Sequence, residues 1–269
     1  MQTILITTNL TLLLACFTYA SWSDYRSREV SNKIWILLAP PTFTITFTKF
    51  LFYEPSQLVS YALCCSLTAI FVTVLFYTGG FGGADAKALM CLALALPFYP
   101  KNILTPLSNE ISPISQVFFP LTVFSNSVLL VIIPVLSIIT RNLYWRWKTG
   151  RRLFEGNQAN ESLGRKALVL MTGYKIPIAR LKEKWHIYPL EDVEENTSKS
   201  SQRKLVILPK DKSRNAIIER LDREIQSGTI KDEVWASPGL PMLVLITIGL
   251  VIALFFGDII WTLVGLLFR

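Results

Sequence analysis

Long apolar blocks dominate the chain and predict helices that cross a membrane. A helix needs about 20 apolar residues to cross about 30 Å of hydrocarbon. Apolar residues make up 51% of the sequence, and they gather in blocks rather than in alternating runs. We predict six spans, at Met1–Ala20, Ile34–Tyr53, Leu58–Thr78, Ala86–Tyr99, Phe118–Thr140 and Leu240–Phe268. The fourth block is short for a span, and its length fits a helix that begins below the membrane surface.

Polar residues collect between the fifth and the sixth block. The predicted fold is therefore an all-α polytopic membrane bundle of six transmembrane helices, with a small α+β cytoplasmic insertion before the last helix. Residues 1–140 would form the first five spans, 141–237 the soluble insertion, and 238–269 the sixth transmembrane helix.

The insertion shows short apolar runs flanked by charge. Ala167–Met171 and Leu205–Leu208 favour strands. Ser213–Gln226 predicts an amphipathic helix with Ser213 as its cap, and Glu194–Arg203 predicts a mobile polar loop. The apolar face of the predicted helix consists of Ile217, Ile218, Leu221 and Ile225.

The first block differs from a cleaved signal peptide in its charge. A signal peptide begins with basic residues, and Met1–Tyr19 contains no Lys or Arg. Thr18-Tyr19-Ala20 is a weak cleavage site at best. We interpret the block as a span.

The loops between the predicted spans divide sharply by charge. Lys and Arg gather in Ser21–Lys33, beside Gly79–Asp85, and in the insertion, whereas Glu54–Gln57 and Pro100–Val117 carry few charges. Cationic loops stay in the cytoplasm. We therefore expect a plasma-membrane protein with its N-terminus outside and with the insertion inside.

The net charge of +8 is explained by the same cytoplasmic segments, which hold topology and favour anionic lipids. Basic and aromatic residues mix at Arg141–Lys148, directly after a span, where they serve as an interfacial anchor. The lipid bilayer is thus the expected partner of these charges, and a nucleic acid is not.

Cysteine and histidine are too few or too scattered for most hydrolytic sites. Cys16, Cys64, Cys65 and Cys91 all lie in apolar blocks without metal-site spacing, so we expect buried thiols, no disulfide and no metal. His186, beside Trp185, is the single histidine of the chain. A lone histidine argues against Ser-His or Cys-His hydrolysis.

Acidic residues near membrane spans are costly and usually functional. Asp24 follows the first predicted span, Asp85 follows a glycine-rich turn and opens the fourth, and Asp258 lies in the last. Asp24 and Asp85 are both expected at cytoplasmic ends of separate spans. Asp258 is expected deep in the last span or near its outer end, and we interpret it as structural.

Each of the first two aspartates also has a structural interpretation. Asp85 could cap the fourth helix, since Asp is a favoured N-cap. Asp24 could be an interfacial charge paired with Arg26 or Arg28. Their predicted location on one side of the membrane favours a functional pair instead.

Two carboxylates held close together share one proton, because both cannot ionise easily. One of them can then accept a proton from water while the other polarises a peptide carbonyl. This chemistry needs no metal and no cofactor. The sequence therefore predicts an aspartic peptidase.

Three segments resemble the archaeal preflagellin peptidases, a branch of the type 4 prepilin peptidases with a GxGD motif. They are Asp24-x-Arg26-x-Arg28-x-Val30-x-Asn32, Gly82-Gly83-Ala84-Asp85-Ala86-Lys87 and Trp235-x-x-Pro238-Gly239-Leu240-Pro241. The resemblance covers essentially the whole chain. It implies that Asp24 and Asp85 are catalytic, with support from Gly82, Gly83, Ala84, Lys87, Arg26, Arg28 and Asn32.

The chain departs from the family pattern at two places. Ala84 stands where GxGD has its second glycine, which adds only a methyl group. The cysteine-rich methyl-transfer region of bacterial prepilin peptidases is absent, which favours a peptidase without N-methylation activity.

The resemblance implies a membrane-inserted preflagellin or prepilin precursor as the substrate. Its short basic leader would be cut at the cytoplasmic border of its hydrophobic helix. A basic leader is not obviously attracted to a basic insertion, so Glu29 or an ionised catalytic Asp would have to supply the attraction.

Two other functions fit parts of the sequence. Relatives of signal peptide peptidase and presenilin share GxGD and a proline motif, but they cut inside the hydrophobic segment. The polar surroundings expected for Asp24 favour a cut at the border. A proton-coupled transporter would place its carboxylates near the midplane and often contain an inverted repeat, which we do not find.

Overall fold

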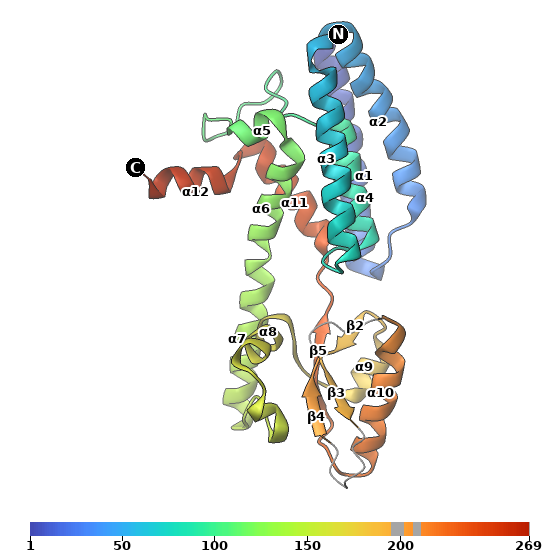
Figure 1. Ribbon diagram of the computed structural model, residues 1–269, viewed down its shortest axis with the longest axis vertical. Helices are drawn as coiled ribbons and strands as arrows, with labels where there is room; N and C mark the ends of the chain where they lie inside the picture. The colour runs from blue at the N-terminus through green and yellow to red at the C-terminus, as the bar shows by residue number, and fades with distance from the viewer. Residues whose placement is uncertain (195–201, 207–210, 269) are drawn as a thin grey trace. The chain divides into compact units, whose positions relative to one another are not determined.

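The computed structural model describes residues 1–194, 202–206 and 211–268, and it divides into two units (Figure 1). The membrane unit comprises Met1–Val131 and Pro241–Arg269, and the second unit comprises Ile132–Leu240.

One short helix lies at the centre of the membrane unit. This helix, α4 (Gly83–Ala95), contacts α1, α2, α3, α6 and α11, and most of its side chains are buried. The other elements of the unit are α1 (Gln2–Ser27), α2 (Asn32–Tyr53), η1 (Pro55–Gln57), α3 (Leu58–Tyr77), α5 (Pro113–Val117), α6 (Phe119–Leu130), α11 (Met242–Phe255) and α12 (Ile259–Leu267).

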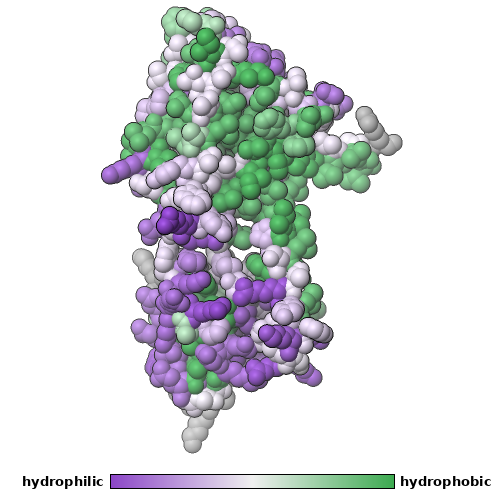
Figure 2. Space-filling view, turned by 180° about the vertical axis from the view of Figure 1, so that it is seen from behind, coloured by the Kyte–Doolittle hydropathy of each residue, from purple (hydrophilic) through white to green (hydrophobic). Residues whose placement is uncertain are grey.

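The described residues contain four helices that are long and apolar enough to cross a membrane, or five if the bent pair α11 and α12 forms one span. The prediction of six spans is therefore not confirmed. The fourth predicted span is the reason, because the 13 residues of α4 extend about 20 Å, short of the roughly 30 Å of hydrocarbon. Apolar side chains cover a broad surface of the membrane unit (Figure 2).

α4 ends inside the bundle because other helices supply hydrogen bonds to its last carbonyls. Such carbonyls have no partner within the helix, and each one left unpaired in hydrocarbon costs several kcal/mol. The Ala95 carbonyl accepts from Asn9 Nδ2 at 3.3 Å and from Thr46 Oγ1 at 3.1 Å. The Leu94 carbonyl accepts from the Tyr61 hydroxyl at 3.1 Å. Side chains from α1, α2 and α3 thus stabilise the C-terminal end of α4 inside the bundle.

The last predicted span, Leu240–Phe268, is not one straight helix. α11 and α12 are bent by 61° relative to each other around Gly257, whose φ is 83°. Asn126 on α6 satisfies the interrupted backbone, since its Nδ2 donates to the Gly257 carbonyl at 2.9 Å and its Oδ1 accepts from the Ile259 N–H at 3.1 Å.

The second unit combines helices with short antiparallel strands, as predicted. β5 (Glu233–Pro238) is the central strand of a sheet with order β1-β5-β2, and β3 pairs with β4. Tyr174 lies opposite Ala236 in this sheet. The remaining elements are α7 (Ile132–Thr149), η2 (Gly156–Asn160), α8 (Leu163–Thr172), β1 (Tyr174–Pro177), α9 (Ile178–Glu183), β2 (Ile187–Pro189), β3 (Glu191–Glu194), β4 (Gln202–Leu205) and α10 (Asp211–Gln226).

The strand predicted at Ala167–Met171 is wrong, because these residues lie in α8. Ser162 caps that helix by accepting from the Arg165 N–H at 3.4 Å, and a short apolar run does not distinguish a strand from a helix. The strand predicted at Leu205–Leu208 overlaps β4 only at Leu205, and residues 207–208 lie outside the described residues.

The amphipathic helix predicted at Ser213–Gln226 is confirmed as α10. It begins at Asp211, so Ser213 is not its cap, and its apolar face is buried at Ile217, Ile218 and Leu221. The loop predicted at Glu194–Arg203 is wrong at its two ends, which belong to β3 and β4, and residues 195–201 lie outside the described residues.

Candidate active site

Asp85 is the third residue of α4, so the prediction that it is the N-cap residue is wrong, although its side chain does help to cap the helix. The N-cap is Gly82, whose backbone N–H donates to Asp85 Oδ2 at 3.1 Å. This bond is the reach-back half of a capping box, in which an acidic side chain at N3 binds the N-cap amide. Asp85 is 9% exposed, so the bond holds a buried carboxylate at the first turn of α4.

The glycines before Asp85 differ in how much room they leave. A Cβ atom on Gly82 would lie 2.8 Å from Asp85 Oδ2, whereas one on Gly83 would meet nothing closer than the Phe76 ring at 3.5 Å. Ala84 occupies the second position of α4, and alanine is the best helix former. Replacement of the second glycine of GxGD is therefore compatible with this backbone.

Asp24 lies inside the last turn of α1, not beyond the first span as expected. The apolar block ends near Ala20, but no Gly or Pro interrupts Ser21–Ser27, so the helix continues to Arg28, which has a φ of 58°. Asp24 Oδ2 is buried and accepts no hydrogen bond.

α11 begins beside Asp24. Ser21 Oγ donates to the Leu243 carbonyl at 3.1 Å and lies 2.7 Å from Thr247 Oγ1, which fixes the first turns of α11 against α1. The backbone amide of Leu243 faces the Asp24 carboxyl. Ser21 and Thr247 belong to no recognised motif, and their only signal in the sequence is a hydroxyl inside or beside an apolar block.

Asp24 and Asp85 lie on neighbouring helices, since α1 contacts α4. The charge of the Asp24 carboxyl acts on the Asp85 carboxyl. Arg28 is close enough for its charge to act on Asp24, but among the described residues neither Arg26 nor Arg28 forms an ion pair with Asp24. Arg26 is exposed.

Lys87 connects the two segments that carry the aspartates. Its Nζ donates to Asn32 Oδ1 at 2.7 Å. Asn32 is the first residue of α2, shortly after Asp24, and Lys87 lies two residues after Asp85. This hydrogen bond joins the beginnings of α2 and α4.

Asp258 lies elsewhere, at the break between α11 and α12. Its Oδ1 accepts from the Trp261 N–H and its Oδ2 from the Ser112 hydroxyl, both at 3.0 Å. Ser112 and Ser115 continue this buried polar network to Thr122. Asp258 is 5% exposed, and both of its oxygens are paired.

The cysteines and the histidine lie apart from the aspartates. The four cysteines, all within the described residues, form no disulfide, and Cys64 and Cys91 are buried while Cys16 and Cys65 are half-buried. His186, in the second unit, packs edge-on against Trp185 at 5.9 Å. No group of three or more His, Cys, Asp or Glu side chains suited to a metal occurs in the part of the chain that the structure describes.

Comparison with known proteins places the similarities of this membrane protein among peptidases. Residues 11–135 match the model of the type IV leader peptidase family, and residues 165–259 match that of the archaeal peptidase A24 C-terminus, type II. The chain is thus similar to the type IV leader peptidase family over these residues, and the segment that this model matches contains both Asp24 and Asp85.

Three preflagellin peptidases are similar to the chain along most of its length. That of Methanococcus maripaludis is 24% identical over 244 residues, which cover 89% of this chain and 90% of the relative. That of Methanococcus voltae is 26% identical over 249 residues, covering 89% and 91%. That of Methanocaldococcus jannaschii is 21% identical over 246 residues, covering 89% of each chain. The resemblance to archaeal preflagellin peptidases is confirmed.

Proposed function

We propose that this protein is a membrane aspartic endopeptidase of the GxGD type, which removes the short leader from preflagellin or prepilin-like precursors. Asp24 and Asp85 are its catalytic residues. The observation that carries the proposal is a pair of carboxyl groups on two contacting helices, α1 and α4. The Asp85 carboxyl is buried, and the Asp24 carboxyl has a buried oxygen with no hydrogen-bond partner.

In the proposed reaction the two carboxyl groups hold one proton between them. The ionised carboxylate removes a proton from water, and the oxygen of that water attacks the scissile carbonyl carbon. The protonated carboxyl hydrogen-bonds the carbonyl oxygen as negative charge develops on it. When the tetrahedral intermediate breaks its C–N bond, the leaving amine takes a proton from the carboxyl that first acted as base.

The supporting residues hold these carboxyl groups in position. The Gly82 amide orients Asp85, and the absence of a side chain at Gly82 leaves room for its carboxylate. The hydrogen bond from Lys87 to Asn32 keeps the start of α4 beside the segment that follows Asp24. Gly83 and Ala84 form the first helical turn, and Arg26 and Arg28 place positive charge at the end of α1.

The position of the pair supports cleavage at a membrane border. Asp24 lies in the last turn of α1 and Asp85 in the first turn of α4, next to the cationic segment that is expected to remain in the cytoplasm. A membrane-inserted precursor with a basic leader would present its leader–helix junction at this depth. A relative of signal peptide peptidase would instead cut well inside the hydrophobic helix.

The test is cleavage of a membrane-embedded preflagellin by the purified protein. Wild type is compared with Asp24→Asn and Asp85→Asn, and mass spectrometry locates the cut. We expect the wild type alone to trim the leader at its border with the helix. Equal cleavage by all three proteins would remove both aspartates from the mechanism, and a cut deep in the helix would favour the intramembrane alternative.

A further inference from the structure

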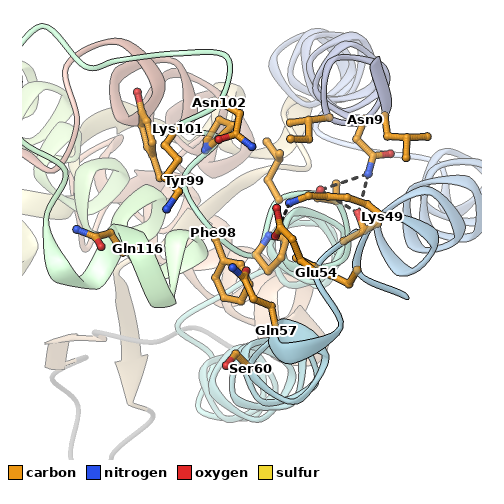
Figure 3. A pocket seen from close by; sticks show the side chains of 18 of the residues that line it. Asn9, Lys49, Glu54, Gln57, Ser60, Phe98, Tyr99, Lys101, Asn102 and Gln116 are labelled. Carbon is orange, nitrogen blue, oxygen red and sulfur yellow. Dashed lines mark hydrogen bonds and ion pairs between the residues drawn. The ribbon is translucent and has the colours of Figure 1, made fainter. Parts of the chain in front are cut away.

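A polar cavity of about 570 Å³ lies in the membrane unit, between the first half of α1, the second half of α2 and the irregular chain that follows α4 (Figure 3). Asn9 and Thr46 line it, and apolar walls come from Phe50 and Phe98. The cavity exists because α4 ends at Ala95, whereas the neighbouring helices α1 and α2 extend further.

The cavity is remote from the aspartate pair. Asn9 precedes Asp24 by 15 residues on α1, which corresponds to about 22 Å along a helix. Ala95 follows Asp85 by ten residues on α4, or about 15 Å. The cavity and the candidate active site therefore lie toward opposite ends of the same two helices.

The charged groups in the cavity favour an anion. Lys49 Nζ lies 3.3 Å from Glu54 Oε2, and Gln2 also donates to Glu54, so this acid is fully engaged. Lys101 is an exposed second cation, which leaves the lining with two lysines against one acid. The last carbonyls of α4 are already hydrogen-bonded, so the lysines are the strongest charges that a ligand would meet.

We propose that this cavity binds the phosphodiester headgroup of an anionic phospholipid. The phosphate would lie between Lys49 and Lys101, and the polar end of the headgroup would meet the amides of Asn102 and Gln116, which Figure 3 shows on the same side of the cavity as Lys101. Phe50 and Phe98 suit the beginning of an acyl chain, and exposed apolar residues such as Phe52 and Leu51 lie beside them at the end of α2. A soluble phosphodiester shares the headgroup chemistry but lacks the chain.

The test measures lipid binding by native mass spectrometry of the detergent-purified full chain. Phosphatidylglycerol is titrated against wild type, Lys101→Gln and the double variant Lys49→Gln/Lys101→Gln. Removing a lysine near a lipid phosphate should weaken binding of the first lipid about fivefold for each cation removed. Lys33→Gln is the matched control, since Lys33 is an exposed lysine at the opposite end of α2.

The expected result is one tightly bound phosphatidylglycerol in wild type and in Lys33→Gln, with stepwise weaker binding in the other two variants. Equal retention by all variants, or equal retention of phosphatidylcholine by the wild type, would overturn the proposal. Glycerophosphoglycerol, the soluble phosphodiester without acyl chains, would also overturn the proposal if it bound as tightly as the lipid, because a soluble ligand would then be the occupant. Lys101 is exposed, so its single variant keeps the test valid if the double variant does not fold.

Discussion

Both ends of α4 contain buried polar groups, but the two ends differ in how many hydrogen-bond partners these groups have. At its C-terminal end the Leu94 and Ala95 carbonyls receive hydrogen bonds from three other helices. At its N-terminal end the buried Asp85 carboxyl has one backbone hydrogen bond, and the charge of a second carboxyl group, that of Asp24, acts on it. Burial of an unpaired polar group costs free energy, so one end stabilises the bundle and the other retains a costly arrangement suited to chemistry.

The same contrast separates the three acidic residues that the sequence singles out. Both oxygens of Asp258 accept hydrogen bonds, whereas Asp24 has a buried oxygen with no partner. A paired buried carboxylate needs no further ligand. An unpaired one beside a second carboxyl group is a candidate for catalysis, because it can bind a water or a proton.

Among the residues that support the two aspartates, the largest effect is expected at Gly82, which leaves room beside Asp85. Gly82→Ala should lower the cleavage rate by about 100-fold, since a shift of about 1 Å in a reacting group can cost that much. Its new Cβ would displace the Asp85 carboxylate. Gly83→Ala, whose Cβ fits, should retain cleavage within about threefold, and the comparison of initial rates checks both. Similar rates for the two variants would contradict this role of Gly82.

The second prediction concerns the bond between α2 and α4. Lys87→Met should lower the cleavage rate by about tenfold through loss of alignment, and Asn32→Leu should do the same because it removes the acceptor. Lys87→Arg, which can still donate, should recover most of the rate. The pH profile is the second readout, since misalignment of two carboxyl groups that share a proton should shift its limbs. A profile and rate unchanged in Lys87→Met would exclude the positioning role.

The third prediction concerns the paired carboxylate. Asp258→Ala leaves the Trp261 N–H without its acceptor and removes one of the two acceptors of the Ser112 hydroxyl. We expect unfolding in detergent to become easier by about 1–3 kcal/mol, with cleavage unchanged by the folded protein. Loss of cleavage at normal stability would show that Asp258 belongs to the active site.

The fourth prediction concerns the satisfied end of α4. Thr46→Val removes one of the two donors to the Ala95 carbonyl and also the acceptor of a 2.6 Å hydrogen bond from Asn9 Nδ2, which can still donate to Ala95. The free energy of unfolding should fall by about 1 kcal/mol, measured by thermal or detergent unfolding. Thr44→Val is the control, because the Thr44 hydroxyl bonds only within α2 and is exposed. If both variants lost the same free energy of unfolding, the hydrogen bond from Thr46 to α4 would not contribute to stability beyond a bond within α2.

The long apolar blocks and the charges of the loops predicted the helical membrane unit and its separate α/β region. They could do so because a helix that lies in hydrocarbon needs a long, uninterrupted apolar segment. They could not predict where helices end. Asp24 lies within α1 because the helix does not stop where the apolar block ends. It continues until Arg28 adopts a left-handed backbone conformation. The break at Gly257 depends on Asn126, which is 131 residues away in the chain.

The sequence predicted the two aspartates of the candidate site and their order in the chain, but it did not predict the contacts that hold them. The bond from the Gly82 amide places Asp85 at the third helical position, which distinguishes it from an N-cap only once the backbone is known. Ser21 beside Leu243 is a contact across 222 residues of sequence. Polar residues inside apolar blocks, such as Asn9, were the signal for such contacts.

The central claim is that Asp24 and Asp85 act as one unit, and a double-variant comparison of cleavage rates tests it most directly. Residues that act as a unit are strongly non-additive. We predict that Asp24→Asn and Asp85→Asn each lower the rate by at least about 1,000-fold, and that the double variant is no slower than either single variant. Losses that multiply in the double variant, or a single variant that keeps near-normal turnover, would contradict the paired-aspartate mechanism.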